Sequence, residues 1–361
     1  MFPKFARVGH AGHVNRCLSG LPASQLEADA SRTAVGFYCI GSLELLDALN
    51  SKTTETDREN WRGWIWEQHT NGRNGAGFRP GPFTTPASAT PQPYGAYNGP
   101  HIVMTYTALL TLAILRDDFT KLDRAGLISF VRSCQKDDGS FSIVPGYGES
   151  DLRTLYCAFC ISDMLGDWSA IDVERALRYI ETCRTYEGGY GQNPYCEASG
   201  GPTYIALASL HIAPRPPGSS RRLTPSQRAK SIHWLIHNQD ASGGFCGRTG
   251  KAADACYSFW CGAALKILGA DDLVDAEAHA RFIASCQFKF GGIAKMPASD
   301  PDPYHTYLAI AALSLYPPTI PDADSEPAPT VKSWEFGRLD ALLNATEETV
   351  AWIRTHVPIE S

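Results

Sequence analysis

The densest group of reactive side chains lies between residues 243 and 260, in the stretch GGFCGRTGKAADACYSFW. Asp254 and Cys256 stand two residues apart and offer a carboxylate oxygen and a thiolate sulfur, both of which zinc accepts as ligands. Arg248 and Lys251 precede them and carry positive charge that could bind a diphosphate. The stretch therefore predicts a metal site beside an anion site.

His305 completes the candidate metal site, because three protein ligands of O, S and N type leave a fourth position open, as in catalytic zinc sites. Taken alone, Cys256 would more readily be a buried core thiol, since the chain has 11 cysteines without a paired framework. However, Cys256 and His305 open equivalent predicted helices in successive repeats, so they should lie side by side at one rim. Asp302 could orient His305 or simply cap its helix.

Tyr257 and Lys295 would extend the anion site. Tyr257 can donate a phenolic hydrogen bond, and Lys295 follows the next glycine turn, ten residues before His305. The alternative for Arg248 and Lys251 is an ordinary pair of solvated loop residues. The neighbouring turns carry few cations, which favours a diphosphate clamp.

The composition limits the partners: the chain has 361 residues, 43% of them hydrophobic, and a formal net charge of -6. This balance indicates a soluble globular protein without a basic field for nucleic acid. There is no signal-peptide core, and no run approaches the roughly 20 apolar residues of a membrane span. We expect reduced cysteines and a cytoplasmic protein. The sequence lacks GxSxG, GxGxxG and Walker motifs, so hydrolase, dinucleotide-binding and P-loop functions have no support.

A repeated unit must position these residues. Glycine turns recur about every 50 residues, each after a helix pair, and an aromatic or aliphatic residue closes each turn. The closing residues are Phe78, Phe141, Tyr190, Phe245 and Ile293. Helix pairs can stack as an open solenoid or close into a ring, and the chemically distinct segments after the turns favour a ring around one shared cavity. We predict an all-α fold, an α-α barrel that is a closed toroid of helix-pair repeats with a central cavity.

The predicted barrel has two parts of unequal size. We expect residues 1–316 to form a single catalytic barrel domain. Residues 317–361 should form a proline-rich linker and a final amphipathic helix, from about Val331 to His356, that packs on the barrel.

Aromatic residues cluster at the predicted helix starts, and this pattern has two interpretations. Most such residues are ordinary core, but a ring of them around a cavity would make an apolar funnel for a long hydrocarbon. The nearby metal and phosphate candidates favour the funnel. These aromatic residues are Tyr156, Tyr204, Tyr257, Trp260, Tyr304 and Tyr307.

From about Asn15 to Tyr316 the chain resembles the β subunits of protein prenyltransferases. The resemblance rests on the strings SRTAVGFYCIGSLELLDAL, PHIVMTYTALLTLAIL, DDGSF, SDLRTLYCAFCISDML, GGFCGRTGKAADACYSFW and DPDPYHTYLAIAALSL. Among these subunits the chain most resembles those of type I geranylgeranyl transfer. The resemblance implies an α-α barrel with one catalytic zinc that works only as a heterodimer with a separate prenyltransferase α subunit.

The resemblance also implies residue roles, position by position. The zinc ligands would be Asp254, Cys256 and His305, with Asp302 orienting a ligand. The diphosphate would be bound by Arg248, Lys251, Tyr257 and Lys295, with Ser199 nearby. The catalytic set would be Asp254, Cys256, His305, Tyr257 and Lys295. The isoprenoid tunnel would be lined by Ala34, Tyr156, Tyr204, Trp260 and Leu308. The substrate peptide would contact His101, Val103, Arg153 and Tyr304.

Three positions distinguish this chain within the family pattern. Ala34 stands where farnesyl enzymes have a tryptophan that shortens the tunnel, which leaves room for a twenty-carbon chain. Lys295 stands where farnesyl enzymes have an aspartate that recruits magnesium, so its ammonium would replace that ion. Ser199 stands in EASGG where the family usually has a histidine, so this diphosphate contact is lost or bridged by water.

The implied reaction is transfer of geranylgeranyl from geranylgeranyl diphosphate to the cysteine of a C-terminal CaaX sequence, on small GTPase-type proteins. Zinc would supply the thiolate, and magnesium would not be required. Two rivals within the family are farnesyl transfer and Rab-type geranylgeranyl transfer. Two alternatives come from other classes. A terpene cyclase that protonates its substrate needs a DxDD-type motif, which this sequence lacks. A non-catalytic helical-repeat scaffold would bind no zinc.

Overall fold

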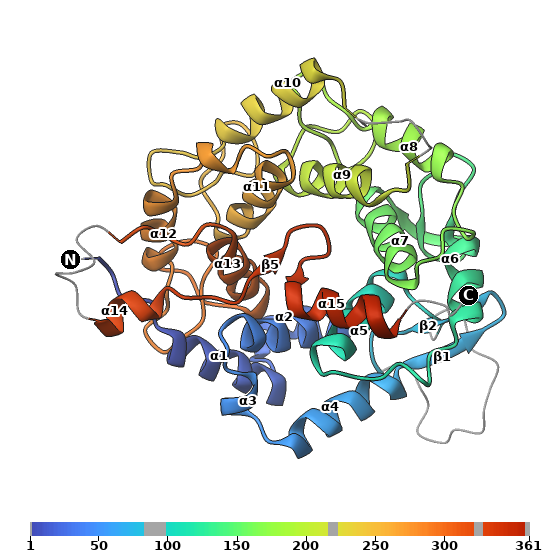
Figure 1. Ribbon diagram of the computed structural model, residues 1–361, viewed down its shortest axis with the longest axis horizontal. Coiled ribbons are helices and arrows are strands. Elements are labelled where there is room, and N and C mark those ends of the chain that lie inside the picture. Colours follow the sequence, from blue (N-terminus) through green and yellow to red (C-terminus); the bar gives the residue numbers. More distant parts are fainter. Residues whose placement is uncertain (1, 83–98, 216–222, 321–327, 358–361) are drawn as a thin grey trace.

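The computed structural model describes residues 2–82, 99–215, 223–320 and 328–357, which form a ring of helices (Figure 1). The inner helices are α2 (Arg32–Leu45), α5 (Ile102–Ile114), α7 (Leu152–Leu165), α9 (Gly200–Ile212), α11 (Ala255–Ile267) and α13 (Pro303–Leu315). Each packs against the next, and α13 packs against α2, so the ring is closed. The predicted all-α barrel is confirmed.

The outer helices surround this ring and connect its members. They are α1 (Arg7–Ser19), α4 (Glu55–Glu67), α6 (Arg124–Cys134), α8 (Val173–Thr182), α10 (Pro225–Ile236) and α12 (Ala276–Ser285). Shorter elements join them: η1 (Ala23–Ser31), α3 (Leu49–Lys52), β1 (His69–Gly72), β2 (Gly75–Phe78), β3 (Ser142–Val144), β4 (Tyr147–Ser150) and η3 (Asp271–Leu273). No helix in the described part of the chain combines the length and apolarity needed to cross a bilayer.

Burial explains why the inner and outer helices differ in sequence. Helix α5 reads IVMTYTALLTLAI, and every residue except Val103 is buried, because other helices surround it on all sides. Helix α8 reads VERALRYIET and buries only Ala176, Tyr179 and Ile180, which face the ring. The amphipathic outer helices thus cover an almost wholly apolar inner layer.

The glycine turns fix the outer helices to the inner ones. Gly188 and Gly243 have φ of 109° and 85°, and a Cβ atom at either would overlap the backbone of the following outer helix. A threonine of the inner helix then holds the residue that closes the turn, since Thr203 Oγ1 accepts from the Tyr190 amide at 2.9 Å. The predicted turns therefore set the spacing between layers.

The same device closes the ring between its first and last repeats. Gly291, with φ of 95°, lies directly against Gly9 of α1. His10 Nδ1 accepts from the Gly292 amide at 3.0 Å, and its Nε2 lies 2.9 Å from Gln287 Oε1. Burial lowers the pKa of His10 to about 4, so the imidazole is neutral and can accept from one partner while donating to the other.

The C-terminal segment differs from the prediction of one helix from Val331 to His356. It forms α14 (Ala328–Ser333), a hairpin of β5 (Leu339–Asp340) and β6 (Ala345–Thr346), and α15 (Glu347–His356), which packs on α5. The helix cannot continue because Asn344 adopts a left-handed φ of 54°, and Thr346 caps α15 by accepting from the Thr349 amide. The hairpin turn, residues 341–344, enters the interior of the ring (Figure 1).

Candidate metal centre and cavity

The three predicted metal ligands meet where α11 and α13 begin. Asp254 is the N-cap of α11, Cys256 is its second residue, and His305 is the third residue of α13. One ligand atom from each lies within 4.8 Å of the others, and His305 Nε2 is 3.4 Å from Asp254 Oδ1. The repeat register therefore brings these residues together as the sequence predicted.

Asp302 makes contacts that fit both of the functions its position suggested. Its Oδ1 accepts from the His305 amide at 2.8 Å and so caps α13, while its Oδ2 lies 2.6 Å from His305 Nδ1. This contact fixes the ring and turns Nε2 toward Asp254 and Cys256. A carboxylate behind a metal-binding histidine commonly has this arrangement.

The protonation of the cluster suits a cation. Burial alone would lower the pKa of His305, but hydrogen bonds with Asp254, Asp302 and Cys256 outweigh it and raise the pKa to about 11. Burial raises the pKa of the Cys256 thiol. Burial would also raise the pKa of Asp254, but its hydrogen bonds lower it overall. A proton on His305 thus balances the carboxylates, and a zinc ion could take its place because the oxygen, sulfur and nitrogen donors fit zinc.

Lys295 and Lys251 approach this cluster differently. Lys295 Nζ lies 3.7 Å from Asp254 Oδ2, and its backbone carbonyl accepts from the Ala255 amide at 2.8 Å. Its side chain is 55% exposed and can therefore reach a bound anion. Lys251 is exposed on the loop before Asp254.

The remaining anion-binding candidates line a cavity. Arg248 Nη1 lies 2.8 Å from Glu197 Oε2, so its guanidinium is paired in this state. Burial raises the pKa of Tyr257, and a side-chain hydrogen bond with Ser199 opposes this effect. Ser199, Tyr257 and Arg248 all belong to the lining of this cavity.

The cavity has a volume of about 900 Å³ and collects residues from all six inner helices. Ten predicted site residues line it: His101, Val103, Arg153, Tyr156, Ser199, Tyr204, Arg248, Tyr257, Trp260 and Tyr304. Ala34 and Leu308 are buried within α2 and α13 and are not among its lining residues, so their place in the tunnel wall stays a prediction. A chamber of this size, mostly apolar with a few polar groups, suits a long hydrocarbon with a polar end.

Two residues predicted to contact a peptide sit at the cavity edge in contrasting states. Arg153 is held by two acids, with Nη2 at 2.7 Å from Asp151 Oδ2 and 2.5 Å from Glu149 Oε2. Burial lowers the pKa of His101 to about 4, and its buried Nδ1 has no hydrogen-bond partner among the described residues. His101 lines the cavity, so its unpaired ring nitrogen could pair with a group of a bound ligand.

The sequence interpretation missed Tyr106 and Asn344, which also line the cavity. Tyr106 is the fifth residue of α5, and tyrosine also occupies the fifth position of α7, α9 and α13. This repeated position was a visible signal. Asn344 gave no comparable signal, because it comes from the C-terminal hairpin.

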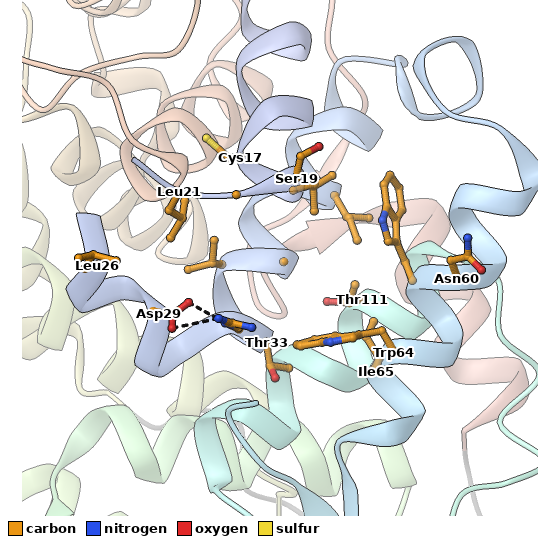
Figure 2. Close-up of a pocket in the computed structure, with 17 residues that line it drawn as sticks. Cys17, Ser19, Leu21, Leu26, Asp29, Thr33, Asn60, Trp64, Ile65 and Thr111 are labelled. Carbon is orange, nitrogen blue, oxygen red and sulfur yellow. Dashed lines mark hydrogen bonds and ion pairs between the residues drawn. The ribbon is translucent and has the colours of Figure 1, made fainter. Parts of the chain in front are cut away.

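A second cavity, of about 640 Å³, lies on the outer side of the ring (Figure 2). Figure 2 shows Trp64 and Asn60 of α4 across from Cys17 and Leu21, with the Asp29–Arg32 ion pair between η1 and α2. Among the described residues, it shares no lining residue with the central cavity and contains none of the predicted site residues. Of the two cavities, only the central one thus contains predicted site residues among those described, while Asp254, Cys256 and His305 line neither.

Comparisons with known proteins agree with this architecture. The model of the prenyltransferase alpha-alpha toroid domain matches residues 5–345. A geranylgeranyl transferase type-1 subunit beta of Arabidopsis thaliana is 42% identical over 226 residues, covering 61% of this chain and 60% of that protein. The corresponding subunit of Dictyostelium discoideum is 35% identical, covering 83% and 88%. The structure of Candida albicans protein geranylgeranyltransferase-I complexed with GGPP superposes with a TM-score of 0.83 at 25% identity, covering 98% and 99%.

Proposed function

The chain belongs to the family of protein prenyltransferase β subunits, and we propose that it transfers a geranylgeranyl group from geranylgeranyl diphosphate to the cysteine of a C-terminal CaaX sequence. The observation that carries this proposal is the meeting of Asp254, Cys256 and His305 beside a cavity suited to a long hydrocarbon, because their chain neighbours Tyr257 and Tyr304 line that cavity. Two type 1 geranylgeranyl transferase relatives and a geranylgeranyltransferase-I structure support the choice of donor.

The first half of the reaction requires a reactive sulfur. Asp254, Cys256 and His305 would hold one zinc ion, and zinc bound there would lower the pKa of a substrate thiol so that a thiolate exists at neutral pH. Asp302 holds His305 Nδ1 and so leaves Nε2 available as a ligand. The folded chain thus brings together an oxygen, a sulfur and a nitrogen donor.

The second half requires a stabilised leaving group. A sulfur–carbon bond forms at C1 of the prenyl chain, and the bond from C1 to the diphosphate oxygen breaks, so negative charge gathers on the diphosphate. Arg248, Lys251 and Lys295 would balance this charge, and Tyr257 would donate a hydrogen bond. Arg248 must leave Glu197 to do so. Because Lys295 already supplies a cation beside the cluster, we expect no magnesium requirement, and a Lys295→Asp variant should acquire one.

The hydrocarbon and the peptide would occupy the cavity together. Tyr156, Tyr204 and Trp260 form an apolar wall that would hold the isoprenoid in one orientation, which favours attack by a neighbouring sulfur. His101 and Arg153 would contact the end of the substrate peptide. The partners would be a prenyltransferase α subunit in an obligate heterodimer and small GTPase-type proteins ending in CaaX. The cytoplasm remains the predicted location.

The test uses the chain co-expressed with a prenyltransferase α subunit. The heterodimer should contain one zinc and should modify a bare CaaX peptide, which separates it from Rab-type transfer. It should prefer geranylgeranyl to farnesyl diphosphate when the two compete. Cys256→Ala should lose zinc and transfer, whereas Cys246→Ala, a half-buried thiol on the same segment, should keep both.

Two results would contradict the proposal. A heterodimer without stoichiometric zinc would instead support the scaffold interpretation. Full transfer by Cys256→Ala would exclude this residue as a metal ligand, and preference for farnesyl diphosphate would move the chain to the farnesyl class.

A further inference from the structure

An ion pair joins two neighbouring repeats at the wall of the central cavity. Arg248 Nη1 lies 2.8 Å from Glu197 Oε2, and both side chains line this cavity. Glu197 belongs to the loop before α9, whereas Arg248 lies between a glycine turn and α11, so 51 residues separate them in the chain. The two side chains are 46% and 56% exposed, so the pair can open when a ligand enters.

The backbone of the two loops holds the partners of this ion pair close together. The amide of Gly200, the first residue of α9, donates to the Gly247 carbonyl at 2.8 Å. Gly247 also packs against the Tyr257 ring, since a Cβ atom at Gly247 would lie 2.1 Å from the Cζ atom that carries the hydroxyl. The residue before Arg248 is therefore fixed both to the Glu197 loop and to the Tyr257 phenol.

The cations proposed to bind the diphosphate differ in how closely an acid holds them. Lys295 Nζ lies 3.7 Å from Asp254 Oδ2, whereas Arg248 and Glu197 are 2.8 Å apart. A guanidinium binds a carboxylate and a phosphate with the same N–H groups. Glu197 and a diphosphate would therefore compete for Arg248, and a carboxylate left beside a bound diphosphate would repel it.

We propose that Glu197 is a counter-anion that holds Arg248 while the diphosphate site is free and releases it when a diphosphate enters. Glu197 thereby weakens the binding of the prenyl donor. It takes back Arg248 after transfer, which favours release of the diphosphate product. Glu197 is a positioning residue, because it acts on the diphosphate through Arg248 and forms no bond in the reaction. The inference rests on the proposed function, since the competition requires a diphosphate ligand.

Glu197→Gln tests this competition, because glutamine keeps the size of the side chain and removes its charge. Calorimetric titration of the heterodimer would give dissociation constants for geranylgeranyl diphosphate and for inorganic diphosphate. We expect both constants to fall about fivefold, near the upper limit for an exposed ion pair. The gain should shrink in about 1 M salt, which screens charges. The dissociation constant for geranylgeraniol, which has the same hydrocarbon chain but no charge, should not change.

Glu149→Gln is the matched control. Glu149 also lines the cavity and pairs with an arginine, since its Oε2 lies 2.5 Å from Arg153 Nη2. The same loss of charge there should change the two diphosphate constants by less than about twofold, because solvent and salt screen charges that are not in contact. A second control repeats Glu197→Gln in an Arg248→Gln background. The gain should fall there to less than about twofold, since both changes remove one interaction.

The outcomes separate this inference from the proposed function. If the unmodified heterodimer neither binds geranylgeranyl diphosphate nor transfers its prenyl group, the proposed function fails. If it does both, and Glu197→Gln leaves the diphosphate constants unchanged or raises them, the inference about Glu197 is overturned. A gain that persists in the Arg248→Gln background, or that Glu149→Gln reproduces, would be a general effect of charge and would also overturn it. A gain for both diphosphates that requires Arg248 and is absent for geranylgeraniol supports it.

Discussion

Two regions are built on the same inner helices: the first turns of these helices, which we call the mouth, and the C-terminal turn of residues 341–344, which we call the floor. The floor pairs neutral donors and acceptors one to one, whereas the mouth gathers charged and metal-binding groups. At the floor, four uncharged hydroxyls each have a carbonyl acceptor. At the mouth, Asp254, Cys256 and His305 crowd within 4.8 Å, and His101 Nδ1 has no partner among the described residues. The difference teaches that the candidate ligand-binding groups gather at the first turns of the inner helices, whereas the floor keeps only neutral, paired groups.

Helix geometry explains why the two ends divide in this way. The first turn of a helix leaves backbone amides without intrahelical partners and carries the positive end of the helix dipole. Cap positions such as Asp254, Ser199 and Asp302 therefore face the mouth, where anions are favoured. One turn deeper the backbone is satisfied, so side chains there can be used for packing and support.

The largest effect should come from removing a metal-ligand candidate at the mouth. His305→Ala should abolish zinc binding and lower transfer by more than about 100-fold, the upper end expected even for a residue that only supports a ligand. The fold should persist, because the helices are held by the apolar core. Zinc content, transfer rate and the melting temperature would be compared with those of His237→Ala, which alters the exposed C-cap residue of α10. If His305→Ala lost its fold, His305 would support the structure, and the contrast between the mouth and the floor would be wrong.

A smaller effect at the mouth should come from Asp302→Asn. An amide can still cap α13 but orients His305 less well, so zinc affinity should fall by about 10-fold to 100-fold. Asp275→Asn is the matched control, because Asp275 caps α12 by accepting from the Ala278 amide at 2.9 Å and contacts no predicted ligand. Equal zinc affinity in the two variants would show that Asp302 is only a cap.

The two regions also differ in how far the sequence could predict them. Asp254 and Cys256 are close in the chain, and the glycine turns gave the repeat register that placed His305 beside them. The floor was missed because its hydrogen bonds span 237, 186, 137 and 37 residues. The helical pattern near the C-terminus concealed a hairpin, since Asn344 acts through a backbone conformation that no hydrophobic period reveals.

The pKa values of two histidines also separate the mouth from the contact between the first and last repeats. His305 at the mouth has its pKa raised to about 11, whereas burial lowers the pKa of His10, at the seam of the ring, from 6.5 to about 4. Because the unfolded chain binds this proton more readily, the contribution of His10 is complete above pH 6.5 and is lost as the pH falls toward about 4. Within that window, His10 contributes about 1.4 kcal/mol per pH unit to the slope of the free energy of unfolding against pH.

Urea unfolding of the heterodimer between pH 7 and pH 5 would measure this slope. His10→Gln should flatten it by about one proton, because glutamine can still accept from the Gly292 amide and donate to Gln287 but does not titrate. An unchanged slope would mean that His10 titrates alike in the folded and unfolded chains. The contacts of His10 with Gly292 and Gln287 would then not favour the neutral imidazole.

The smallest effect should come from the floor, where Tyr307→Phe removes one hydroxyl and leaves the Asn344 carbonyl without its donor at 2.7 Å. An unsatisfied buried carbonyl costs about 1 to 3 kcal/mol, and the Asn344 backbone can shift to recover part of it, so we expect a loss of about 1 kcal/mol in the free energy of unfolding. Zinc content should not change, because no predicted ligand contacts this hydroxyl. Tyr307→Phe could instead lose zinc while keeping its stability. The mouth and the floor would then be coupled, and it would be wrong to assign ligand binding to the first turn of the inner helices and structural support to the fifth residue.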